Sequence, residues 1–170
     1  MTKLLAVLVL LIPSVAAANW SFKAPKGWKR DTDSENAHLE AERNKAAGEA
    51  QFEARHWRGD SQSKASAELM IVPAGMDDMT LQELADMFAS GTANALVGKG
   101  FEIRSSIAPT VKKQGTAARI LEGHGLRLYI QVRVARTAKG ALHALQVRCG
   151  GSPTNDLCKQ AMGSIKLTAR

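Results

Sequence analysis

Residues 125–136 limit the possible folds of this chain more strongly than any other segment. Their sequence is Gly-Leu-Arg-Leu-Tyr-Ile-Gln-Val-Arg-Val-Ala-Arg, a period-two alternation that is typical of a half-buried β-strand. The predicted apolar face consists of Leu126, Leu128, Ile130, Val132 and Val134. The predicted polar face consists of Arg127, Tyr129, Gln131 and Arg133. Such a strand belongs in an antiparallel sheet with a helix or second layer over its apolar side.

Further strands are expected around this one. Alternating or purely apolar runs predict strands at residues 20–22, 37–42, 49–57, 66–72, 101–107, 116–122 and 141–149. Alanine and glutamate also favour helix, so the 37–42 and 49–57 segments are open to both structures. Residues 101–149 together predict a meander of four antiparallel strands, with glycine-containing turns between them.

Two helices are predicted to pack on the sheet. Thr80 and Glu83 have capping-box spacing, and the helix that they start is expected to end near Gly98 or Gly100. Its predicted apolar side consists of Leu81, Leu84, Ala85, Phe88, Thr92, Ala95 and Leu96. A last helix is expected after a cap at Ser152 or Thr154, with an apolar side made of Leu157, Ala161 and Ile165.

The first eighteen residues have the pattern of a secretory signal peptide. Lys3 provides a positive start, residues 4–12 are apolar, and Ala16 to Ala18 form a small-residue cleavage site. The apolar run is shorter than the roughly 20 residues that span a bilayer, which disfavours the alternative of an uncleaved anchor. We therefore expect a periplasmic or secreted single domain over residues 19–170, without stable membrane insertion after cleavage.

Cys149 and Cys158 are the two cysteines of the chain. In an oxidising compartment this pair predicts one disulfide, which would contribute about 2 to 3 kcal/mol in the loop-entropy account. A redox pair is the alternative, although the intervening residues do not resemble a Cys-x-x-Cys motif. The formal net charge of +7 is scattered along the chain, which favours anionic partners or surfaces but not nucleic acid.

Three short motifs resemble the PsbP-like superfamily, a group that includes the PsbP protein of photosystem II and the Ran-binding Mog proteins. The motifs are Phe22-x-x-Pro25-x-Gly27-Trp28, Leu81-x-x-Leu84-Ala85-x-x-Phe88 and Met162-Gly-Ser-Ile165. The resemblance implies an α+β fold, an α/β/α sandwich with a central antiparallel sheet. It also implies a binding, assembly or chaperone-like role, and it transfers no functional residue.

Residues with catalytic or metal-binding potential do not form a recognised motif in the sequence. The four histidines, His38, His56, His124 and His143, lack metal-site spacing, although His38, Glu40 and His56 would form a weak site in a suitable register. Carboxylates at Glu40, Glu42, Glu49 and Glu53 are more simply a solvated face than a hydrolase pair. We therefore expect a protein that is not an enzyme and needs no metal or cofactor.

The strongest candidate site is a cationic surface on the meander. Its predicted members are Arg119, Arg127, Tyr129, Arg133 and Arg148. Arginine and tyrosine are enriched in protein-interaction hot spots; the simpler interpretation is that a helix covers this face and the arginines extend to its edges. The leading hypothesis is a protein that binds an envelope or secreted partner, for example an immunity protein against an antibacterial effector. The alternative is an envelope module for anionic lipid or polysaccharide.

Overall fold

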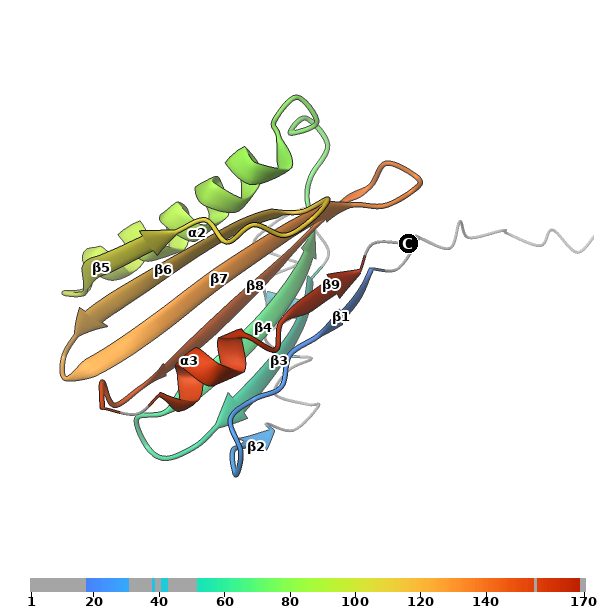
Figure 1. Ribbon diagram of the computed structural model, residues 1–170. Coiled ribbons are helices and arrows are strands. Elements are labelled where there is room, and N and C mark those ends of the chain that lie inside the picture. The colour runs from blue at the N-terminus through green and yellow to red at the C-terminus, as the bar shows by residue number, and fades with distance from the viewer. Residues whose placement is uncertain (1–17, 31–37, 39–40, 43–51, 155, 169–170) are drawn as a thin grey trace, which may run out of the picture.

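The computed structural model describes residues 18–30, 38, 41–42, 52–154 and 156–168. These residues form a seven-stranded antiparallel sheet in the order β2-β3-β4-β8-β7-β6-β5 (Figure 1). Its strands are β2 (Lys29–Arg30), β3 (Phe52–Arg58), β4 (Lys64–Ile71), β5 (Glu102–Ile107), β6 (Gly115–Gly123), β7 (Leu126–Arg136) and β8 (Leu142–Gly151). A separate two-stranded ribbon pairs β1 (Asn19–Ser21) with β9 (Lys166–Thr168).

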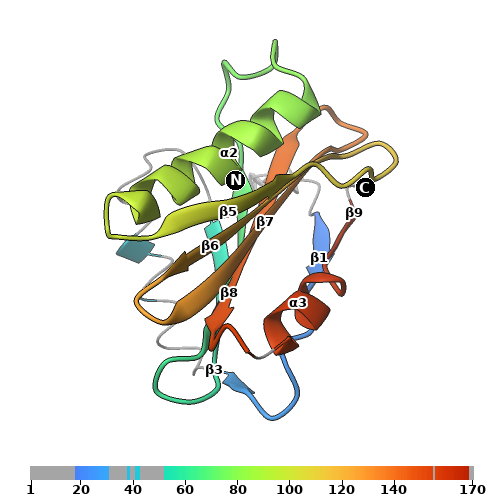
Figure 2. The same cartoon turned by 60° about the vertical axis from the view of Figure 1, so that its left-hand side comes forward.

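The predicted meander over residues 101–149 is confirmed. Strands β5, β6, β7 and β8 are neighbours in chain order, and β7 pairs with β6 on one side and with β8 on the other (Figure 2). Val132 and Val134 on the predicted apolar face of β7 are fully buried. Tyr129 and Gln131 on the opposite face are buried as well, so both faces of this strand are covered.

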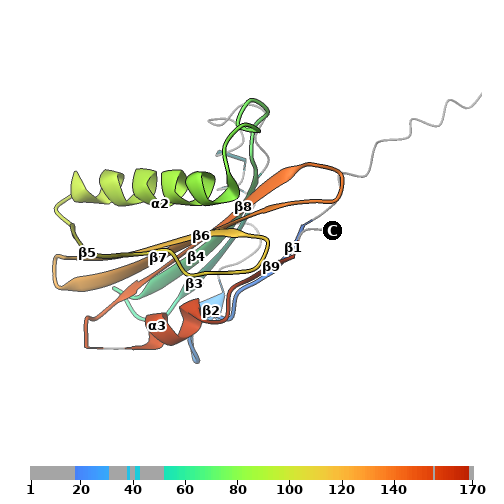
Figure 3. The same cartoon turned by 45° about the horizontal axis from the view of Figure 1, so that its top comes forward.

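Helix α2 (Leu81–Val97) covers one face of the sheet, which we name the helix face (Figure 3). The capping box of Thr80 and Glu83 is formed and Gly98 is the C-cap, as predicted. The buried side chains of α2 are Leu84, Ala85, Ala89 and Ala93, whereas the predicted core residue Ala95 is exposed. A Cβ atom at Gly115 would overlap the Leu81 carbonyl, so this glycine permits the close approach of α2 to β6.

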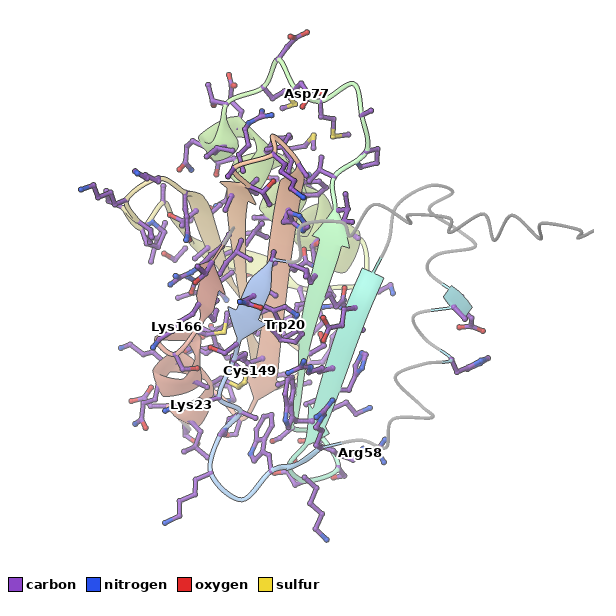
Figure 4. The ribbon with its side chains drawn as sticks, turned by 90° about the vertical axis from the view of Figure 1, so that its right-hand side faces the viewer. Trp20, Lys23, Arg58, Asp77, Cys149 and Lys166 are labelled. Carbon is purple, nitrogen blue, oxygen red and sulfur yellow. A yellow bond between two sulfur atoms is a disulfide. The ribbon has the colours of Figure 1, made fainter. Side chains whose placement is uncertain are left out.

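The opposite face, which we name the ribbon face, lies under α3 (Leu157–Met162) and the β1–β9 ribbon (Figure 3). Its core joins Phe22, Ile165 and Leu167 to Leu145 and Val147 of β8. The predicted disulfide between Cys149 and Cys158 is present, with a Cα–Cα distance of 5.4 Å, and connects β8 to α3. Figure 4 shows the ribbon face from the side of β1, with Trp20 in front of the sheet.

The expected α/β/α sandwich is wrong. The described residues are dominated by strands, and the ribbon face carries a helix of six residues and a two-stranded ribbon in place of a full helical layer. Ile165 and Leu167 are buried while Lys166 and Thr168 are exposed, an alternation that makes the closing segment a strand. The fold is therefore a mostly antiparallel β domain with one long covering helix.

One local prediction near this end, the cap of the last helix, is also corrected. Helix α3 begins after Asp156, which makes no side-chain cap hydrogen bond. The hydroxyls of Ser152 and Thr154, the predicted cap residues, lie 2.9 Å apart and bond to each other. Consecutive polar residues can satisfy one another in a turn, so their presence does not by itself mark the first helical residue.

Near the N-terminal end, Pro25 to Gly27 form a turn, with Gly27 at a φ of 86°. The strand predicted at 37–42 is wrong where the structure describes it, because His38, Ala41 and Glu42 are helical and His38 Nε2 lies 3.3 Å from Glu42 Oε1. Residues 1–17 of the predicted signal segment (1–18), together with Glu40 and Glu49, lie outside the described residues. No helix among the described residues is long and apolar enough to cross a membrane.

Candidate binding cavity

An open cavity of about 600 Å³ lies on the ribbon face, between strands β5 to β7 and helix α3. Most of the surface that it offers is apolar. Its apolar lining residues include Ile107, Pro109, Ala118, Ile120, Tyr129 and Met162. A concave, mainly apolar space of this size, with a few polar groups on its walls, is typical of sites that bind small molecules.

A chain of ion pairs forms one rim of the cavity. The carboxylate of Glu122 on β6 accepts hydrogen bonds from Arg127 Nε on β7 at 2.7 Å and from Arg104 Nε on β5 at 3.2 Å. Arg127 also donates to the Pro153 carbonyl at 3.1 Å. Arg127, followed by Arg104, lowers the pKa of the Glu122 carboxyl, and Glu122, followed by Tyr129, raises the pKa of Arg127. The charge of Arg127 is therefore already matched within the protein.

Arg133 differs from the rim arginines, because it makes no hydrogen bond or ion pair with any described residue. Its side chain lines the cavity from β7, and its Nε is buried without a hydrogen-bond partner. Burial lowers the pKa of Arg133, since the charged guanidinium loses water. The cavity wall thus contains a cation that lacks a counter-charge among the residues that the structure describes.

The structure separates the five residues of the predicted cationic surface. Arg127, Tyr129 and Arg133 share the ribbon face, and all three line the cavity. Arg119 also contributes to the cavity lining, but its guanidinium lies on the helix face, where Nη2 donates to Asp86 Oδ1 at 3.0 Å and to Ser90 Oγ at 3.1 Å.

Arg148 also lies on the helix face, where it pairs with Glu68 and donates to Ser66 Oγ. The meander order was correctly predicted, but the separation follows from the register. Ile130 faces α2, and its cross-strand neighbours in the β6–β7 and β7–β8 pairs are Arg119 and Arg148.

Sequence reasoning missed a group of buried polar residues beside Arg133, which we name the orphan cluster. Its members are Gln114, Thr116, Arg133 and His143, and each has at least one buried side-chain atom without a hydrogen-bond partner in the described part of the chain. Thr116 is 0 % exposed and His143 is 2 % exposed. A polar residue at an inward-facing position of a strand could have predicted this cluster. Which positions face inward, however, is known only when the strand register is known.

His124, the histidine between two glycines, is held within the fold by local contacts. His124 occupies a left-handed turn position, its Nε2 lies 2.8 Å from the Lys99 carbonyl, and its ring packs against Phe101. Within the described ranges, no three or more His, Cys, Asp or Glu side chains are grouped so that they would hold a metal ion. The weak site considered for His38, Glu40 and His56 cannot be placed, because Glu40 lies outside those ranges.

The fold and the cavity together define a class: a mostly antiparallel β domain with one long covering helix and an apolar cavity, whose wall includes an arginine without a partner in the described part of the chain. No protein-family model matches the chain, and no curated protein matches it in sequence. The resemblance to the PsbP-like superfamily therefore stays a prediction. The geometry of the cavity favours a ligand with an apolar body and an anionic group.

Proposed function

We propose that this chain is a non-enzymatic binding protein of the periplasm or the extracellular space, and that its ligand site is the cavity on the ribbon face. The proposed ligand has an apolar part, which fills the cavity, and an anionic group, which pairs with Arg133. This role corresponds to the envelope module for anionic ligands considered from the sequence, with lipid favoured over polysaccharide because the lining is apolar.

One observation carries this proposal, namely the guanidinium of Arg133 on an apolar wall, which has no counter-charge among the described residues. A partly desolvated charge without a counter-ion is costly to keep in a fold. An incoming anion would supply the missing charge, and in an apolar surrounding that pairing is stronger than in water. The other arginines of the predicted surface have their counter-charges in the protein.

The proposed location rests on two features. The disulfide between Cys149 and Cys158 is typical of proteins from oxidising compartments. Residues 1–18 have a signal-peptide pattern. The PsbP-like resemblance is consistent with a binding role and supports the proposal at that level alone.

A test of this function uses an anionic fluorescent probe with an apolar ring system, such as anilinonaphthalene sulfonate. We expect saturable binding at one site, and loss of that binding in Ala118→Phe, which fills the cavity from its β6 wall. Ala95→Phe is the matched control, because Ala95 is exposed on α2 at the other side of the sheet. Equal probe binding by both variants would contradict the proposed site.

A second candidate, the binding of a protein partner, is favoured by the exposed edge strand β5. This strand is last in the sheet order, and its side chains Ile103 and Ile107 are 42 % and 49 % exposed. An extended segment of a partner could pair with such an edge, as in β-strand addition. Ile107 also lines the cavity, so a side chain of that partner could enter it. An immunity protein that binds an antibacterial effector would fit this mode.

Capture experiments distinguish the second candidate from the first. The mature chain, Ile103→Lys and Ile107→Lys are each used to capture proteins from envelope extract. A stoichiometric partner that is retained by the mature chain and by Ala95→Phe, but lost with both lysine variants, would favour strand addition. A partner that is insensitive to both variants would count against it.

A further inference from the structure

The orphan cluster lies where strands β6, β7 and β8 pass beneath β9. Thr116 is directly opposite Arg133 in the β6–β7 pairing, and Leu145 is directly opposite Arg133 in the β7–β8 pairing. His143 lies two residues before Leu145 and is therefore a diagonal neighbour of Arg133 on the same face. Gln114 Nε2 donates to the Leu167 carbonyl at 2.6 Å, which fixes β9 above the group.

The unsatisfied atoms in this cluster include several hydrogen-bond donors. Arg133 Nε–H, the Thr116 hydroxyl and one ring nitrogen of His143 can each donate, and all are buried without partners among the described residues. Native proteins satisfy the large majority of buried polar groups, so several orphan atoms side by side need an explanation. Neighbouring donors beside an arginine are the groups that bind oxyanions in proteins. Arg133 is the member of the cluster that also lines the cavity.

The charge of the cluster limits the kind of anion. Arg133 is its single permanent cation, and burial lowers the pKa of His143, so that imidazole stays neutral at neutral pH. Gln131, the next residue toward the rim on the same face of β7, is an uncharged amide. One unmatched positive charge suits a monoanion such as a carboxylate better than a phosphate dianion.

The cavity volume limits the apolar part. At the roughly 30 Å³ that one water molecule occupies in the liquid, a volume of 600 Å³ corresponds to about twenty non-hydrogen atoms. This is the size of one long acyl chain and far below that of a two-chain phospholipid. The lining residues Ile107, Ile120 and Met162 offer an apolar surface along which such a chain can pack.

We infer that the cavity binds a single-chain fatty acid, whose carboxylate is held at Arg133 with Thr116 and His143 beside it and whose acyl chain extends between β5, β6 and α3. The inference rests on the proposed function and specifies its ligand class. Arg133 and Thr116 provide recognition of the head group, and the cavity provides affinity for the chain.

The test compares palmitate with its uncharged methyl ester by titration calorimetry. We expect the mature chain to bind palmitate at least tenfold more tightly than the ester, and Arg133→Met to remove this difference. Thr116→Val, which removes a hydroxyl at constant shape, is expected to weaken palmitate binding about three- to tenfold. Arg136→Met is the matched control, because Arg136 lies on the same strand but pairs with Asp77 outside the cavity.

Three outcomes would overturn the inference. One is equal affinity for palmitate and its ester; another is undiminished palmitate binding by Arg133→Met. The third is a crystal structure with palmitate in which water satisfies the orphan cluster and the carboxylate lies at Lys159 on the rim. Each of these is compatible with cavity binding of the anionic probe and its loss in Ala118→Phe. Failure of the fatty-acid inference is thereby separated from failure of the cavity as the ligand site.

If Arg133→Met binds neither compound, its fold is checked by circular dichroism, and Arg133→Lys then provides the decisive comparison. A lysine keeps the charge but lacks the planar fork of donors, so partial recovery of palmitate selectivity is expected. A folded Arg133→Lys without any preference for palmitate over the ester would overturn the inference as well.

Discussion

The two faces of the seven-stranded sheet differ in how completely their polar groups are satisfied. On the helix face, Arg119 pairs with Asp86, Thr92 Oγ1 donates to Gln146 Oε1 at 2.8 Å, and Gln82 bonds the Thr116 backbone from α2. On the ribbon face, the orphan cluster lacks such partners within the described residues, and an apolar cavity adjoins it. The difference indicates that the helix face stabilises the fold and that the ribbon face is the place to look for a ligand.

The largest expected effect compares the packing of the two faces. Leu84→Ala in α2 removes a fully buried side chain and is expected to lower the free energy of unfolding by about 3 to 4 kcal/mol. Met162→Ala on the cavity wall is expected to lower it by only about 1 to 2 kcal/mol, because part of its surroundings is already open. Urea denaturation of both variants measures the difference. Equal losses would show that the ribbon face is packed as tightly as the helix face.

The disulfide provides the next largest effect. Its reduction, or the double change Cys149→Ala with Cys158→Ala, is expected to lower the free energy of unfolding by about 2 to 3 kcal/mol, because the open chain gains entropy. Denaturant titrations with and without a reductant measure this loss. We also expect weaker probe binding, since the bridge connects β8 to α3 beside the cavity. Unchanged probe affinity in the reduced protein would show that the cavity does not depend on this bridge.

Matched arginine variants are expected to change stability in opposite directions. Arg119→Met breaks a hydrogen-bonded ion pair and leaves Asp86 and Ser90 without their donor, so a loss of about 2 kcal/mol is expected. Arg133→Met removes a partly buried charge that has no partner, so a gain of about 1 kcal/mol is expected in the ligand-free protein. Thermal and urea denaturation test both signs. A loss of similar size at Arg133 would mean that its charge is compensated.

A smaller effect is expected from pH at His143. Burial lowers its pKa in the folded protein, whereas the unfolded chain has the ordinary value near 6.5. Above that pH the imidazole is neutral in both states and contributes no difference. As the pH falls below about 6.5, the unfolded state binds the proton first, so stability is expected to fall by at most about 1.4 kcal/mol per pH unit.

The control for this prediction is His143→Leu, which cannot titrate. Between pH 6.5 and pH 5, the difference in unfolding free energy between the variant and the unmodified chain should grow in favour of the variant. If the urea midpoints of His143→Leu and of the unmodified chain differ by the same amount at every pH in this range, His143 is protonated in the folded state or gains a partner there.

Much of the fold could be predicted from local signals. The alternation in β7, the capping box at Thr80 and the stop at Gly98 each report on a few neighbouring residues, and all three are confirmed. The covering of the ribbon face could not be predicted in the same way. The β1–β9 ribbon joins residues from the two ends of the described chain, and the pairing of Trp20 with Leu167 leaves no trace in either local sequence.

The candidate site was predictable only in part. The sequence correctly places Arg127, Tyr129 and Arg133 on one face of β7, because strand periodicity decides that directly. It cannot decide which of them has a counter-charge. Glu122 satisfies Arg127 across the β6–β7 pair, and nothing in the described structure satisfies Arg133. That distinction depends on the register and on tertiary neighbours, as does the position of Arg119 and Arg148 on the helix face.

We propose that the charge of Arg133 on the ribbon face lowers the stability of the ligand-free protein and is compensated when an anionic ligand binds. The most direct test measures the melting temperatures of the unmodified chain and of Arg133→Met, each with and without saturating palmitate. The account predicts that the order reverses: the variant melts higher without palmitate, and the unmodified chain melts higher with it. A variant that melts lower under both conditions, or that gains as much from palmitate as the unmodified chain, would contradict it.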